Sequence, residues 1–165
     1  MKKIPERQVP GLWRFALACY ARPGVEAACL ALQEQGADIC LLLCGAWLES
    51  RATACTPERI EALRAMAAPW QQAVVAPLRQ LRRQWKPAST GDPALAALRD
   101  RLKQLELDAE RLLLARLEDA CRAWDDQQPA AADWLAELSP PAADRATLQI
   151  LRDAAHQDQL APGSD

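Results

Sequence analysis

The sequence predicts an all-α protein, a compact bundle of about six or seven helices with one long helix after residue 92. Val, Ile and Thr, which strands favour, occur only four times each. Ala, Leu, Arg, Gln and Glu dominate, and these residues lose little rotamer freedom in a helix. Half of the 165 residues are apolar, and a chain of this length usually forms one domain, so we expect a single helical domain over residues 1–165.

Three helices are expected in the first third of the chain. The first covers residues 12–21. The second begins at Pro23, because proline suits a first helical turn, and stops before Gly36. Asp38 caps the third, over residues 39–51, which is apolar on nearly every face and is therefore expected to be the central buried helix.

Prolines divide the middle of the chain. Thr56 is expected to cap a helix over residues 57–67. A further helix over residues 69–86 follows, with a kink expected at Pro77. Residues 87–93 hold several turn-forming residue types in succession, and they are predicted to form an internal loop.

The long helix is expected over residues 93–126, with Asp92 as its cap. Its apolar residues recur at intervals of three and four and form a short heptad stripe, which packs within the chain or against another copy. The stripe consists of Leu95, Leu98, Leu102, Leu105, Ala109 and Leu112.

Two shorter helices close the predicted fold. They are expected over residues 130–138 and 140–155, and Ser139 stands before the second as a candidate cap. Residues 157–165 are polar and are expected to be a frayed tail.

The net charge of −2 conceals an asymmetry, because residues 1–87 carry +5 and residues 88–165 carry −7. The halves could attract each other within one molecule or between two. A protein of this overall charge is an unfavourable candidate for broad nucleic-acid binding.

The sequence predicts a cytoplasmic protein that does not span a membrane. No export signal is recognisable, and the longest apolar run, residues 39–48, is about half of the ~20 residues that a span needs. Six cysteines in such a chain are expected to be reduced, mostly as small buried apolar side chains.

Several motifs resemble those of a known family. They are the aromatic segment Leu12–Gln33 with its turn Tyr20-x-x-Pro-Gly-Val, a Leu-rich third helix that ends in Trp-Leu, and Trp70-x-x-x-Val-Val-x-Pro-Leu-Arg79. The chain resembles, over residues 12–122, a bacterial family of small, functionally uncharacterised α-helical proteins that is common in proteobacteria, including pseudomonads. The resemblance implies a helical fold and supplies no activity and no site residues.

Metal, cofactor and thiol chemistry are poorly supported, and no cofactor is predicted. Cys40 and Cys44 are one helical turn apart, but no Cys-x-x-Cys is present and the single histidine, His156, is remote in sequence. His156 is expected to pair locally with Asp153. An enzyme whose site joins Cys40, Cys44 and an acidic residue remains one alternative.

Acidic pairs could hold magnesium on facing helices. The candidates are Asp125-Asp126 and Glu106 with Glu110, but no matching acidic motif occurs on an apolar helix. We interpret both pairs as solvated helix faces. The groups able to move protons or hold ions are therefore expected to be scattered rather than to converge.

A basic stripe, the heptad stripe of the long helix and an aromatic cluster are the candidate binding surfaces. The stripe consists of Arg79, Arg82, Arg83 and Lys86 on one helical face. These cations could merely complement the helix dipole, or they could bind an acidic protein or nucleic-acid phosphate. Trp13 and Tyr20 share a face of the first helix, and an exposed part of it could be an interface.

The sequence therefore favours a non-enzymatic protein-binding or adaptor module. The acidic half of the chain makes a protein partner, including a second copy of this chain, the preferred ligand of the basic stripe. A nucleic-acid-binding protein that uses residues 79–86 is the less favoured alternative beside the enzyme.

Overall fold

The computed structural model describes residues 11–126 and 133–160, with only the backbone for 158–160. The described residues contain eight α-helices, one π-helical segment and no β-strand, which confirms the all-α prediction. In chain order these are α1 (Leu12–Tyr20), α2 (Val25–Glu34), α3 (Ile39–Ser50), α4 (Pro57–Trp70), η1 (Gln71–Val75), α5 (Ala76–Ser89), α6 (Pro93–Cys121), α7 (Trp134–Leu138) and α8 (Arg145–Leu160). Because α4, η1 and α5 follow one another without a gap, they form one continuous helix. The nine elements of the described residues are therefore seven continuous helical segments.

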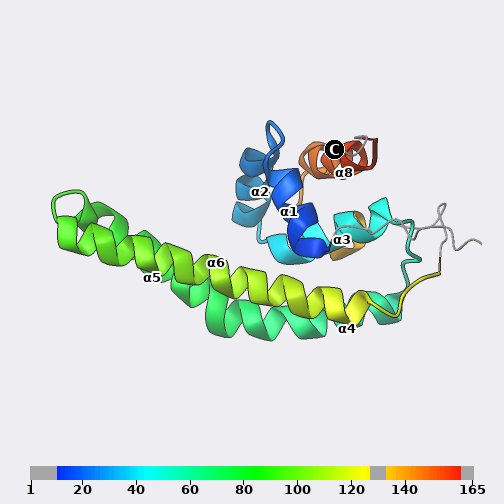
Figure 1. The fold of residues 1–165 in the computed structure, drawn as a ribbon, viewed down its shortest axis with the longest axis horizontal. Helices are drawn as coiled ribbons and strands as arrows, with labels where there is room; N and C mark the ends of the chain where they lie inside the picture. The colour runs from blue at the N-terminus through cyan, green and yellow to red at the C-terminus, as the bar shows by residue number, and fades with distance from the viewer. Residues whose placement is uncertain (1–10, 127–132, 161–165) are drawn as a thin grey trace, which may run out of the picture.

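Four helices surround α3 and form a body of five helices with it. Helices α1, α2, α7 and α8 contact one another or α3, and residues 39–48 of α3 are all buried, as predicted for the central helix (Figure 1). Gly45 permits the close approach of α7, because a Cβ there would lie 3.0 Å from a methyl carbon of Leu138. Trp134 fills the core beside it and donates from its indole nitrogen to the carbonyl of Thr53 at 2.8 Å.

The remaining helices form a long hairpin that extends beyond the body. One limb is the continuous helix of α4, η1 and α5, and the other limb is α6 (Figure 1). The predicted break at Pro69 is therefore wrong. Pro69 and Pro77 each remove a backbone donor, and the wider π turn of η1 lies between them, where a helix can absorb such a change of register without ending.

The turn of the hairpin is shorter than the sequence predicts. Helix α5 continues through Pro87 to Ser89, so the loop comprises only residues 90–92 instead of 87–93. Asp92 caps α6 as predicted, because its carboxylate accepts from the backbone nitrogens of Ala94 and Leu95, each at 3.1 Å. The far end of α6 lies at Cys121, five residues before the predicted end.

Caps decide the other helix boundaries. Asp38 and Thr56 cap α3 and α4 as predicted. Helix α2 begins at Val25 and not at Pro23, because Gly24 before it has a left-handed backbone with φ of 83°. Ser139 ends α7 instead of opening the last helix, which starts at Arg145 after Asp144 has capped it.

The ends of the predicted C-terminal elements also differ. Residues 130–132 lie outside the described part of the chain, and α7 begins at Trp134. The expected tail at residues 157–165 is helical as far as Leu160, and residues 161–165 are not described. A single domain over residues 1–165 stays a prediction.

No helix in residues 11–126 and 133–160 is by itself both long and apolar enough to cross a bilayer. The pair α1 and α2 reaches that length and composition only together, with a bend of 104° between the two.

The core accounts for the fold's stability, and a matched pair of leucines tests this. Leu63 of α4 has no exposed surface, whereas Leu30 of α2 is 55% exposed. We expect Leu63→Ala to lower the free energy of unfolding by about 2–5 kcal/mol and Leu30→Ala to change it by less than about 0.5 kcal/mol. Urea denaturation followed by circular dichroism measures both, and equal effects would contradict this description of the core.

Candidate functional site on the hairpin

The basic stripe is divided between the interior of the hairpin and solvent. Arg79 donates to Glu106 at 3.0 Å and to Glu110 at 2.8 Å, and Arg82 donates to the second oxygen of Glu106 at 2.5 Å. Arg83 and Lys86 are exposed. Half of the predicted stripe therefore binds the acidic residues of α6 in the same chain.

The expectation that Glu106 and Glu110 form a solvated helix face is wrong. Glu106 is only 6% exposed, and Glu110 is half-buried. Burial by itself would raise the pKa of Glu106, but the hydrogen bonds and charges of Arg82 and Arg79 outweigh it and hold the pKa below its ordinary value. Burial dominates at Glu110 and raises its pKa despite the charge of Arg79.

The same network reaches the body of the protein. With its amide oxygen turned toward the guanidinium, Gln33 of α2 accepts from both terminal nitrogens of Arg79, at 3.0 and 2.9 Å. Next to it, Gln71 of η1 donates to the Asp38 carboxylate at 2.8 Å. Burial raises the pKa of Asp38 in spite of its hydrogen bonds to Leu41 and Gln71. The polar groups thus converge where hairpin and body meet, contrary to the sequence-based expectation.

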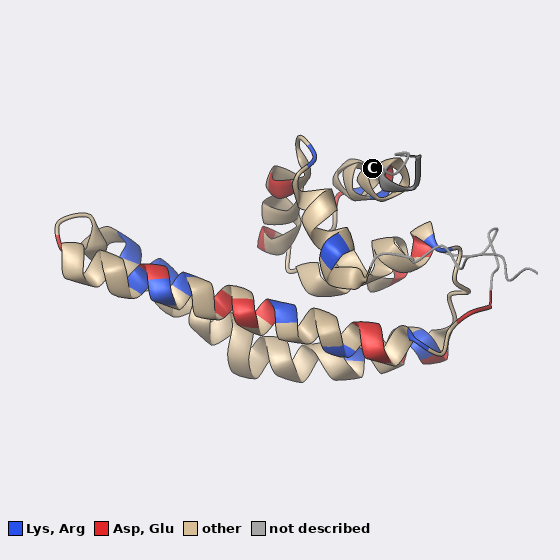
Figure 2. Cartoon of the chain, viewed as in Figure 1, with Lys and Arg blue, Asp and Glu red and all other residues tan. Residues whose placement is uncertain are grey.

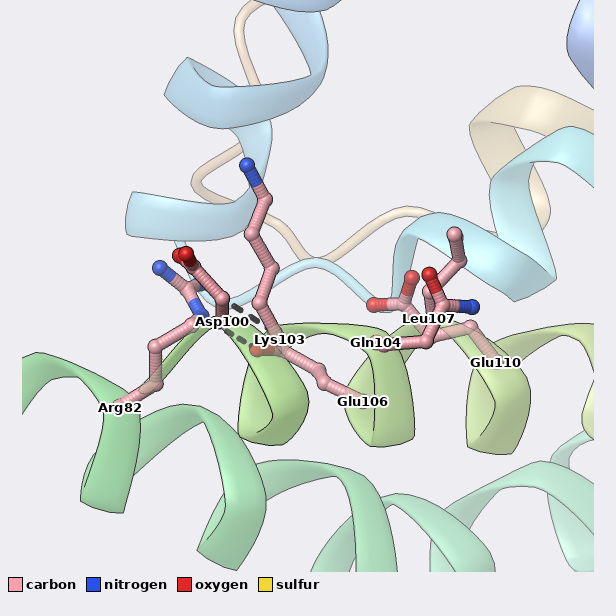
Figure 3. Close-up of a pocket in the computed structure, with 7 residues that line it drawn as sticks. All are labelled: Arg82, Asp100, Lys103, Gln104, Glu106, Leu107 and Glu110. Atoms are coloured by element: carbon pink, nitrogen blue, oxygen red, sulfur yellow. Dashed lines mark hydrogen bonds and ion pairs between the residues drawn. The ribbon is translucent and has the colours of Figure 1, made fainter. Parts of the chain in front are cut away.

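An open cavity of about 390 Å³ lies along this network on the side of the body (Figure 3). It is lined by Arg82, Asp100, Lys103, Gln104, Glu106, Leu107 and Glu110. Lys103 rises from α6 above the Arg82–Glu106 ion pair. Because charges of both signs line the cavity and its most buried carboxylate is already paired, the cavity does not resemble a site for one small charged substrate.

Basic residues of the first half of the chain form ion pairs with acidic residues of the second half within one molecule. Acidic and basic segments lie side by side along the hairpin (Figure 2). Arg59 of α4 also pairs with Asp126 at 2.6 Å, so residues from the basic half bind residues from the acidic half at both places. Asp125 and Asp126 are both exposed, as expected for a solvated pair, but they lie beyond the end of α6, and Asp126 belongs to this ion pair.

The two candidate aromatics of α1 have different surroundings. Trp13 is half-buried, and the guanidinium of Arg111 from α6 lies 4.9 Å from its ring centroid, so this aromatic helps to join hairpin and body. Tyr20 keeps an exposed part, while burial of the remainder and the neighbouring Cys29 thiol raise the pKa of its hydroxyl. Their use as a partner-binding surface stays a prediction.

The thiols of α3 are poorly suited to nucleophilic chemistry. Burial raises the pKa of Cys40 well above its ordinary value, with a further contribution from Asp38. The Sγ of Cys44 lies 3.8 Å from that of Cys121, and this contact and burial raise the pKa of Cys44. Both side chains are therefore protonated near neutral pH, whereas a nucleophilic cysteine must form the thiolate.

No group of three or more His, Cys, Asp or Glu side chains that could hold a metal ion occurs in the described part of the chain. His156 lies with its Nδ1 2.7 Å from the carbonyl oxygen of Arg152. Asp153, its predicted partner, accepts a hydrogen bond from Gln149 instead.

The heptad stripe of α6 separates into a buried row and an exposed row. Leu102 and Ala109 are buried toward α5, whereas Leu98, Leu105 and Leu112 are 49%, 53% and 44% exposed. Leu81 of the paired helix α5 is also exposed, to 36%. We call Leu81, Leu98, Leu105 and Leu112 the outer leucine face. The sequence analysis placed Leu98, Leu105 and Leu112 in one heptad stripe with Leu102 and Ala109, and it did not separate the exposed row from the buried row.

The Glu106 network should contribute strongly to stability. We expect Glu106→Gln to lower the free energy of unfolding by roughly 2–3 kcal/mol, because it removes the carboxylate that two partly buried arginines share. Asp119→Asn is the matched control, since its ion pair with Arg122 is largely exposed and should contribute less than about 0.5 kcal/mol. Urea titration at neutral pH measures both variants, and similar small losses for the two would contradict a structural role for the network.

A family model described as "Protein of unknown function (DUF2390)" matches residues 11–117, from the start of α1 through most of α6. Searches of curated proteins and of solved structures each found no match. The match includes both limbs of the hairpin and their ion-pair network. Because it covers more than half of the 165 residues, the chain belongs to the DUF2390 family of uncharacterised proteins.

Proposed function

We propose that this protein is a non-enzymatic protein-binding module and that its hairpin presents the binding surface, the outer leucine face. The observation that carries the proposal is the exposure of Leu98, Leu105 and Leu112 at seven-residue intervals on one face of α6, together with the exposed Leu81 on the paired helix α5. Single exposed leucines are common, but a row of them on one face is typical of a surface that another protein covers.

The ion-pair network supports this choice over the basic stripe. Arg79 and Arg82 are occupied by Glu106 and Glu110, which leaves only Arg83 and Lys86 of the stripe for an acidic protein or for phosphates. Two exposed cations make a weak anion-binding surface at physiological salt. The leucines therefore supply more binding surface than the cations.

The proposal includes a bacterial, cytoplasmic setting. All six cysteines are free thiols, and five of them are buried, a pattern that suits a reducing compartment. The motifs of residues 12–33 and 70–79 support the bacterial origin.

Affinity capture tests the proposed binding surface. The tagged full-length chain is incubated with lysate from cells that naturally produce it, and captured proteins, untagged copies of the chain included, are quantified by mass spectrometry. We expect Leu98→Glu combined with Leu112→Glu to reduce capture about tenfold or more, because charges then lie on both sides of Leu105 and interrupt the apolar surface.

Leu30→Glu is the matched control, since Leu30 is an equally exposed leucine on α2. It should leave capture unchanged, and circular dichroism should show unchanged helix content in all variants. A captured set that is the same for the double variant as for the wild type would refute the role of the outer leucine face.

A further inference from the structure

We propose that a second copy of this chain covers the outer leucine face and that the two α6 helices dock antiparallel. This inference rests on the proposed function and names its partner. The exposed residues of α6 on this side recur at alternating intervals of four and three, the spacing by which two helices pair. Leucines at 98, 105 and 112 alternate with Arg101 and Asp108, and Ala94 and Ala115 end the row.

The order of these residues is self-complementary. A two-fold axis at Leu105 places that side chain against its own copy and Leu98 against Leu112 of the second copy. The same axis brings Arg101 close to Asp108 and Ala94 close to Ala115 of the second copy. Each of these two pairs is offset from exact alignment by one residue, which is a rise of about 1.5 Å. This surface is therefore complementary to the same surface on a second copy, as a two-fold interface requires.

The two charges select the antiparallel arrangement. In a parallel pair, Arg101 would face Arg101 and Asp108 would face Asp108, which like-charge repulsion disfavours. Arg101 makes no ion pair or hydrogen bond within the described residues, and Asp108 accepts only from the Gln104 amide. Both charges are exposed and are thus available to the second copy.

The body does not obstruct this face of α6. Leu114 follows Leu105 by nine residues, which is about half a turn around the helix. Leu114 is buried in the core with Leu113 and Leu117, so the body lies on the opposite side of α6 from Leu105. From Ala94 to Ala115 the helix is roughly 33 Å long.

Sedimentation equilibrium of the purified full-length chain tests the proposal. We expect a mass of twice 18.2 kDa for the wild type and of 18.2 kDa for Leu105→Glu. Leu17→Glu is the control, because Leu17 is as exposed as Leu105 but belongs to α1, and this variant should stay dimeric. A wild type that remains monomeric up to about 0.1 mM would overturn the inference.

A charge swap tests the antiparallel register. Arg101→Asp and Asp108→Arg should each raise the dissociation constant of the dimer about tenfold, because each creates a like-charge contact. The double variant should return to within about threefold of the wild type. A double variant that is as weak as the single variants would overturn the antiparallel pairing.

The two proposals fail in different ways. If the capture experiment retains another protein through Leu98 and Leu112 while the wild type sediments as a monomer, the binding module stands and the second copy is refuted. If capture and self-association are both absent, both proposals are refuted.

Discussion

The carboxylate of Glu106 is the contact on which the hairpin depends. Helix α5 contributes no fully buried side chain, so its apolar contact with α6 is only partly shielded from water. The pair is also joined by Glu106, which binds Arg79 and Arg82 and is itself buried. A buried carboxylate without these partners would carry a large desolvation cost, and the two limbs must therefore stay together.

Arg79 also helps to set the position of the hairpin relative to the body. Arg79 contacts Glu110 on α6 and Gln33 on α2, so it connects three helices. Arg111 of α6 also lies over Trp13 of α1, whereas the hydrogen bond from Trp70 to the carbonyl of Ala109 joins the two limbs to each other. The hairpin is therefore held against the body by polar and aromatic contacts beside the shared apolar core, which Leu113, Leu114 and Leu117 of α6 enter. Most of the hairpin's cations bind partners within the chain. What the hairpin presents outward is the outer leucine face.

Much of the fold could be predicted from the sequence because its signals are local. Asp38, Thr56 and Asp92 each accept a backbone hydrogen bond within three residues, and the apolar residues on every side of α3 have no alternative to burial. The break predicted at Pro69 was wrong because the π turn of η1, which follows it, lets the helix continue. The position of a proline in the sequence does not show whether such a turn follows.

The candidate site was less predictable because it depends on pairing between distant residues. Arg82 and Glu106 are 24 positions apart, and either could have been a solvated charge until the hairpin brought them together. The heptad row was visible, but only the register of α5 against α6 decides that Leu102 is buried while Leu105 is exposed. The opposite charges of the two halves were the one sequence feature that anticipated the pairing.

Amide hydrogen exchange in the Arg79→Gln variant tests the central claim most directly. If the arginine–glutamate network holds the hairpin, amides of α5 should lose protection by about tenfold or more while those of α3 keep theirs. Unchanged protection across α5 would show that other contacts hold the two limbs and would contradict this account.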